Sequence, residues 1–351
     1  MSSMSNSNDN VIKLSHGSGG KETARIVSSL ILSLLREDMM AVEGGIGTDE
    51  LDDGATIPIG DGRYIVVSID SYTVNPPFFP GGNLGKLAAS GTINDVLMMG
   101  GEPIAMMDAV VVEEGSRMEE VREIVRSFIE VLREEGVKLI GGDFKVMPRG
   151  QLDRYVITTV GVGIAEKLIV DSNLSPGDKI IVSGTIGEHG AAILAAQENF
   201  SVEGELKSDV QPLKRLMLSL IEEFGHAIHA AQDPTRGGLA QTLNEWASKT
   251  GHLITVNEAE IPIRDEVKAF TELLGVDPLS LACEGRVVLG VSPADADAIL
   301  DSIRELGYRD AAIIGDVKKS EKYGGMVVLE SVAGGLRILE PPSGTIVPRI
   351  C

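Results

Sequence analysis

The chain has 351 residues, which corresponds to about two domains at roughly 150 residues each. Lysine and arginine total 31 against 52 aspartates and glutamates, and the net charge of −21 disfavours binding to nucleic acid or to anionic membranes. The aromatic content of 4% offers little surface for stacking on bases or sugars, and no apolar run reaches the roughly 18 residues that predict a membrane span.

Residues 1–49 are expected to form a flexible N-terminal arm. Its polar start has no signal-peptide core, so the cytoplasm is the expected location. The arm contains a glycine-rich loop, Gly17, Ser18, Gly19 and Gly20, and apolar residues at helical spacing predict a helix over 23–37. The loop fits neither a P-loop nor a dinucleotide-binding fingerprint, although backbone N–H groups at a helix start can approach phosphates. A flexible arm that merely precedes a helix accounts for the same residues.

The region 50–167 alternates predicted strands and helices, as expected for an α/β domain. Strands are predicted over 64–69, 104–112, 137–140 and 155–165, and helices over 84–99 and 118–135. A second domain is predicted over 168–338. Its expected strands are 179–183, 253–256, 285–291, 311–317 and 325–329, and its expected helices are 190–198, 213–231 and 237–248. Closely spaced prolines make 339–351 an expected extended, mobile tail.

Aspartates recur in the first domain in loops, after apolar strands and within one apolar helix. The metal-ligand candidates are Asp53, Asp70, Asp95 and Asp143, and Asn94 and Asp233 are candidates for holding a bound nucleotide. A carboxylate among small and apolar residues needs a partner, and Mg²⁺ is an economical one. Because the chain has 52 acidic residues, caps, turns and surface acids explain any single aspartate, but they explain the set less well.

Two further charged residues occupy positions suited to catalysis. Lys145 follows Asp143 by two residues in a glycine-rich break, where a lysine can neutralise a transferring phosphate or position an amide oxygen. Glu284 lies between an apolar stretch and a glycine, where a desolvated carboxylate can act as a base. A surface lysine and a turn acid are the alternatives. His226 and His229 fall on a predicted helix without a third ligand nearby, and do not predict a metal site.

The chain has two cysteines, Cys283 and Cys351, which excludes a disulfide scaffold and a cysteine-rich metal site. Cys283 adjoins an apolar run and is expected to be a buried small side chain. Cys351 is the last residue of the expected tail, where a thiol can swing between sites as a tethered carrier. A terminal cysteine without function is the alternative.

Taken together, these motifs resemble the HypE family, carbamoyl dehydratases of [NiFe]-hydrogenase maturation within the PurM-like, ATP-dependent superfamily. The resemblance spans about residues 11–351. It rests on Ser15-His16-Gly17-Ser18-Gly19-Gly20, Asp70-Ser71-Tyr72, Gly91-Thr92-Ile93-Asn94-Asp95-Val96, Gly142-Asp143-Phe144-Lys145-Val146, Asp233-Pro234-Thr235-Arg236-Gly237-Gly238, Glu284-Gly285 and Pro348-Arg349-Ile350-Cys351. The terminal motif discriminates best, because other members of the superfamily have no reason to end in cysteine.

The resemblance implies an α/β (α+β) fold of PurM-like two-domain architecture, with a flexible glycine-rich arm, an extended tail and a homodimer formed through the N-terminal domain. It implies that a HypF-type carbamoyltransferase loads Cys351, that this chain uses ATP and Mg²⁺ to dehydrate the S-carboxamide to a thiocyanate, and that the cyano group passes to iron held by a HypC–HypD complex. By the same resemblance, Lys145 stabilises phosphoryl transfer, Glu284 takes protons, and the glycine loop covers the phosphates.

Four alternatives assign another role to the chain. A selenophosphate synthetase needs a reactive cysteine or selenocysteine near its glycine-rich loop, whereas this chain has no cysteine before Cys283. Aminoimidazole ribonucleotide synthetase and thiamine-phosphate kinase do not use a terminal thiol. A non-catalytic carrier that presents Cys351 to partners needs no metal–nucleotide site, so the aspartates and Lys145 disfavour it.

Overall fold

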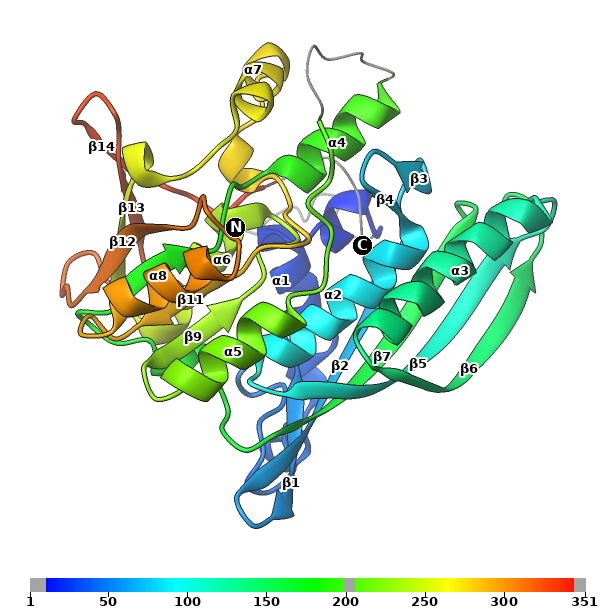
Figure 1. Cartoon of the computed structure of the whole chain (residues 1–351), viewed down its shortest axis with the longest axis horizontal. Helices are drawn as coiled ribbons and strands as arrows, with labels where there is room; N and C mark the ends of the chain where they lie inside the picture. Colours follow the sequence, from blue (N-terminus) through cyan, green and yellow to red (C-terminus); the bar gives the residue numbers. More distant parts are fainter. Residues whose placement is uncertain (1–10, 199–205, 344–351) are drawn as a thin grey trace, which may run out of the picture.

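The computed structural model describes residues 11–198 and 206–343, in which two β-sheets flank a central layer of helices (Figure 1). The first sheet has the strand order β1-β2-β7-β5-β6, and β5 and β6 are its parallel pair. Its strands are β1 (Ala55–Gly60), β2 (Arg63–Tyr72), β5 (Glu102–Glu113), β6 (Lys138–Met147) and β7 (Tyr155–Ala165). A small hairpin, β3 (Phe78–Phe79) and β4 (Gly82–Asn83), precedes the first long helix.

Helices α2 (Leu84–Met98) and α3 (Met118–Glu134) cover one face of the first sheet. Asn83 starts α2, because its side chain accepts hydrogen bonds from the backbone N–H groups of Gly85 and Lys86. Almost every residue of α2 is buried, which explains why its sequence is apolar all round rather than on one stripe. At Gly85 a side chain would collide with the backbone of Ile124 in α3, so the glycine permits this close helix packing.

The second sheet has the strand order β14-β13-β10-β12-β8-β11-β9. Its strands are β8 (Lys179–Val182), β9 (Ile228–Gln232), β10 (Leu253–Asn257), β11 (Val288–Val291), β12 (Ala312–Lys318), β13 (Val327–Glu330) and β14 (Leu336–Ile338). The helices of this domain are α4 (Glu188–Gln197), α5 (Lys214–Phe224), α6 (Gly238–Thr250), α7 (Asp265–Leu274) and α8 (Ala296–Glu305). Trp246 of α6 is fully buried in the hydrophobic cluster on one face of this sheet.

One hydrophobic cluster runs continuously from the first domain into the second. Leu87 and Ile93 of α2 belong to the same buried cluster as Leu216 and Leu220 of α5. Each fully buried leucine or isoleucine contributes about 1.5–3 kcal/mol relative to an exposed one. The two domains are therefore packed against each other through α2 and α5, which lie side by side in Figure 1.

The N-terminal helix is shorter than predicted. Instead of extending over 23–37, α1 covers Lys21–Leu30 and is followed by short 3₁₀ turns at Leu32–Leu34 and Glu37–Met39. None of the α1 residues is buried, and Leu30 and Leu34 are exposed. Without a surface against which to pack its apolar stripe, this segment lacks the tertiary contacts that lengthen helices in proteins.

Two other predictions of secondary structure were wrong. The predicted helix 213–231 ends at Phe224, and the chain then enters strand β9. In this strand, Nδ1 of His229 is hydrogen-bonded to the carboxylate of Asp178 at 2.8 Å. The predicted strand 137–140 continues to Met147, because parallel pairing with β5 carries the backbone through the two glycines. Strands β1, β9 and β14 and helices α7 and α8 were not predicted. No described helix is long and apolar enough to span a membrane.

Candidate active site

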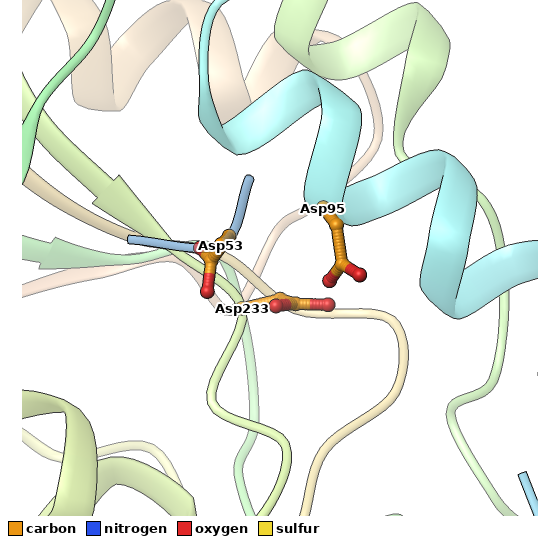
Figure 2. Close-up of side chains that lie close together, drawn as sticks. All are labelled: Asp53, Asp95 and Asp233. Carbon is orange, nitrogen blue, oxygen red and sulfur yellow. The ribbon is translucent and has the colours of Figure 1, made fainter. Parts of the chain in front are cut away.

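Three aspartates from separate segments converge near the domain boundary (Figure 2). Asp53 precedes β1, Asp95 lies on α2, and Asp233 directly follows β9. One carboxylate oxygen from each lies within 4.8 Å of those of the other two. We call these three residues the aspartate triad. Hard oxygen ligands in this number and spacing suit a divalent cation such as Mg²⁺.

Electrostatics within the triad also favours a cation. Burial raises the pKa of Asp53 and of Asp95 well above the usual range, and repulsion from Asp233 raises both further. Burial likewise raises the pKa of Asp233 to about 7. Its Oδ2 is buried without a hydrogen-bond partner among the described residues. Since buried polar atoms are normally paired, the orphaned oxygen fits a metal ligand.

Strand β2 holds the triad from the sheet side. Ser68 donates a hydrogen bond of 2.7 Å to the carboxylate of Asp95. Two residues further on and on the same face, Asp70 lies beside the triad, where its charge raises the pKa of Asp95. Asp70 also lies 3.9 Å from the guanidinium of Arg236. The predicted ligand Asp70 therefore adjoins the triad, whereas Asp233, predicted to hold nucleotide, is part of it.

The glycine-rich loop lies against the segment that carries Asp233. Gly19 has a φ of +87°, and a Cβ on it would lie 2.4 Å from the Cβ of Arg236. Only glycine allows this backbone conformation and this approach without strain. Gly20 is the N-cap of α1, and Ser18 donates a hydrogen bond to Leu14. Through Arg236 and Asp70, the predicted loop and the triad thus belong to one neighbourhood.

A cavity of about 520 Å³ lies beside the same loop. It is lined by His16 and Gly17 of the arm, by the apolar side chains of Ile12 and Ile26, and by Thr73 and Val156 from the ends of β2 and β7. Its size lies within the range of cavities that hold small ligands.

The side-chain amide of Asn94, a predicted nucleotide-binding group, bonds to the backbone of the second domain. Its side-chain NH₂ donates to the carbonyl oxygen of Gln211 at 3.2 Å, and its oxygen accepts from the N–H of Leu213 at 2.8 Å. Both ends of the amide are therefore occupied by the backbone that leads into α5. The residue ties α2 to the second domain.

Glu284 is 1% exposed and has no hydrogen-bond partner for Oε2 among the described residues. Burial raises its pKa well above the usual range, and the charges of Asp233 and then Asp209 raise it further. Asp209, which the sequence did not single out, accepts a hydrogen bond of 3.1 Å from the N–H of Glu284. It lies in an irregular segment without any motif, so no sequence signal pointed to it. Glu284 is thus a desolvated carboxyl group within the field of the triad.

Asp143 and Lys145 lie on β6, at the edge of the first sheet, and face away from the triad. Asp143 pairs with Ala109 and Lys145 with Val111 of β5, and paired residues project to the same face. Ala109 and Val111 alternate with Val110, which is buried on the side of α2 and α3. Within one chain the sheet therefore separates both residues from the triad.

The structure describes one of the two cysteines. Cys283 is fully buried, as expected, and its sulfur accepts a hydrogen bond from the N–H of Gly187 at 3.1 Å. Cys351 lies outside the described residues. The described chain before it runs beside the site, because Glu340 pairs with Lys21 of α1 at 3.0 Å and Pro342 lies next to Gly237.

Known proteins are similar to this chain over nearly its whole length. Residues 51–165 and 175–328 match the N-terminal and C-terminal domains of AIR synthase related proteins. A hydrogenase expression/formation protein of Methanocaldococcus jannaschii is 46% identical over 340 residues, covering 96% of this chain and 98% of that protein. Carbamoyl dehydratase HypE of Cupriavidus necator is 38% identical over 344 residues, covering 97% and 95%.

Solved structures agree with the sequence comparison. The crystal structure of hydrogenase maturation protein HypE in complex with ATP has a TM-score of 0.78 and 36% identity, covering 95% of this chain and 99% of that chain. HypE in the HypE–HypF complex has a TM-score of 0.82 and 36% identity, covering 90% and 99%. The fold is therefore the expected PurM-like α/β architecture, and this chain belongs to the HypE family of carbamoyl dehydratases, which are hydrogenase maturation proteins.

Proposed function

We propose that this chain uses Mg-ATP to dehydrate a carbamoyl group on the thiol of Cys351 to a thiocyanate, the source of the cyanide ligand of [NiFe]-hydrogenase iron. The observation that carries the proposal is the aspartate triad at the domain boundary, beside the glycine loop and beside the segment that leads to the tail. A carrier without catalysis would need no such site. HypE of known structure binds ATP, which supports the same function here.

The reaction moves the γ-phosphoryl group of ATP onto the carbamoyl oxygen and then eliminates phosphate. One N–H proton leaves when the oxygen is phosphorylated, and the second leaves as the C≡N bond forms, giving thiocyanate, ADP and phosphate. Asp53, Asp95 and Asp233 would hold Mg²⁺, which neutralises phosphate oxygens. The proposed proton acceptor is Glu284, which is buried and whose pKa is raised by the charge of Asp233 in the triad. Its dry surroundings protect the activated intermediate from hydrolysis.

The tail is long enough to bring its thiol to this site. Cys351 is the eighth residue after Ser343, the last described residue. An extended chain covers at most about 3.3–3.6 Å per residue, so eight residues span roughly 26–29 Å. Because Pro342 already lies beside the loop that carries Asp233, this reach includes the triad.

The open face of the first sheet is the proposed homodimer interface. Ile69 and Met107 are exposed, so the described helices leave the middle of this face open. One row across it joins Ile69, Val160 and Met107, of which Ile69 is 68% exposed. An apolar sheet face of this kind is normally buried by another layer, and a second copy supplies one. Lys145 projects from the same face, so we propose that it acts at a site formed between the two chains.

The proposed partners follow from the chemistry of the thiol. A HypF-type carbamoyltransferase would load Cys351, in keeping with the known HypE–HypF complex, and a HypC–HypD complex would receive the cyano group on its iron. All of these steps are proposed to occur in the cytoplasm.

Phosphate release tests the function. Carbamoylated protein should release one phosphate per loaded tail when Mg-ATP is added, and Cys351→Ser should release none above background. Equal ATP hydrolysis by the two proteins would contradict the proposal.

A further inference from the structure

One face of α6 carries three polar side chains at intervals of four residues, Gln241, Glu245 and Lys249. This spacing places them in a row along the helix. Glu245 accepts hydrogen bonds from Gln241 at 2.6 Å and from Gln232 of β9 at 3.1 Å. At the end of the row, the Lys249 ammonium pairs with Asp52 and, at 3.3 Å, with Asp171.

Two members of this row, Glu245 in the middle and Lys249 at one end, contact residues adjacent to members of the triad. Gln232 directly precedes Asp233, and its NH₂ group lies 3.5 Å from Oδ1 of Asp53. Asp52 directly precedes Asp53. Lys249 also lies 3.4 Å from the carbonyl oxygen of Leu51, so its ammonium contacts the loop through both a side chain and the backbone.

The loop that carries Asp53 needs such support. It has no regular secondary structure, and Leu51 has a φ of +53°, which is rare for a residue with a branched side chain. Asp95 lies on a helix and Asp233 directly follows a strand, whereas Asp53 lies in a bend two residues before β1. Besides Gln232 and the N–H of Asp171, Lys249 of α6 in the other domain contacts this loop.

Burial of the charges in this cluster costs desolvation free energy that their mutual attraction offsets only in part. The side chains of Asp52, Asp171 and Lys249 are 3%, 6% and 17% exposed, and two carboxylates face one ammonium. Buried ion pairs are often no more stabilising than apolar side chains of similar size. A role in placing neighbouring groups accounts for their presence better than stability does.

We propose that Lys249 is a positioning residue, which holds the 51–53 loop so that the carboxylate of Asp53 meets those of Asp95 and Asp233. This inference rests on the proposed role of the triad as the metal site. Residues that orient metal ligands commonly change metal affinity by about 10–100-fold when removed. Lys249 acts through Asp52 and touches neither metal nor substrate.

Binding of Mn²⁺ in the presence of β,γ-methylene ATP, followed by electron paramagnetic resonance of free Mn²⁺, tests the proposal without any turnover. Lys249→Met should weaken Mn²⁺ binding by about 10-fold or more. Lys249→Arg should recover most of the affinity, because a guanidinium can reach both carboxylates. Lys318→Met, which removes an ion pair with Asp316 elsewhere in the second domain, is the matched control and should bind as the wild type does.

Two comparisons separate the possible failures. If Asp95→Asn binds Mn²⁺ as well as the wild type, the triad is not the metal site, and both proposals fall. If Asp95→Asn weakens binding and Lys249→Met does not, only the positioning role is overturned. The double variant Asp52→Asn/Lys249→Met removes one of the two buried carboxylates that Lys249→Met leaves without a counter-charge, so it lowers the risk of misfolding. Wild-type affinity in the folded double variant would likewise overturn the proposal, and weakened affinity would support it.

Discussion

The two faces of the first sheet share their strands but differ in chemistry. On the covered face, polar groups of β2 pair with α2, since Ser68 bonds to Asp95 and the Tyr72 hydroxyl lies 3.2 Å from that of Thr92. On the open face, Ile69 and Met107 are exposed. Because alternate residues of a strand point to opposite faces, β2 can supply a wall of the charged site and an apolar surface at once. We propose that the covered face serves a ligand within one chain and that the open face pairs with a second chain.

The largest expected effect comes from the covered side of the molecule. Glu284→Gln should slow conversion of the carbamoylated tail by about 10²–10⁴-fold, the usual contribution of a general base. Carbamoylation by the partner enzyme should continue, because Glu284 has no proposed part in it. The variant should therefore accumulate carbamoylated protein in the presence of ATP, measured by mass spectrometry. Wild-type conversion would reject the role of Glu284.

The second effect tests whether the open face contributes to catalysis. Lys145→Ala should slow dehydration by about 10²–10³-fold, as expected on loss of a group that stabilises developing charge. If Lys145 serves the site of the other chain, mixing Lys145→Ala with Glu284→Gln under exchange conditions should restore activity. Each mixed dimer then has one site with both native residues. Mixtures as inactive as the separate variants would show that the two residues act within one chain.

The third prediction concerns how the free energy of unfolding depends on pH through Asp233 of the triad. The pKa of Asp233 is raised from 3.8 to about 7, so in this window the folded protein keeps a proton that the unfolded chain has released. Its contribution to the free energy of unfolding therefore falls as pH rises from 3.8 to about 7. In metal-free protein, Asp233→Asn should lose less stability than the wild type over this range, in thermal unfolding. An identical pH dependence of the two proteins would contradict the assigned shift.

The smallest effect on folding is expected on the open face. Ile69→Glu places a charge in the middle of the exposed row, so it should prevent dimerisation. Because the side chain is 68% exposed, the free energy of unfolding of the isolated chain should change by no more than about 0.5 kcal/mol. Sedimentation equilibrium should show a monomer with a native circular dichroism spectrum. A stable dimer of this variant would place the interface elsewhere.

The sequence predicted those helices and strands whose burial follows a regular pattern along the chain. Helix α2 and strand β7 follow the prediction closely, since continuous burial and strict alternation leave clear patterns in the sequence. The recurring aspartates also gave Asp53, Asp95 and Asp233 as site candidates. The face on which Lys145 lies could not be predicted, because it depends on the register of β6 against β5. Asp209 and Lys249 were missed because their roles arise only when distant segments meet.

The central claim is that Cys351 carries the substrate of this enzyme. The most direct measurement is the mass of the C-terminal peptide after incubation with the HypF-type carbamoyltransferase, carbamoyl phosphate and Mg-ATP. The peptide should first gain the mass of a carbamoyl group and should then lose the mass of one water as thiocyanate forms. A peptide that remains unmodified at Cys351, or that stays carbamoylated while ATP is consumed, would contradict the account.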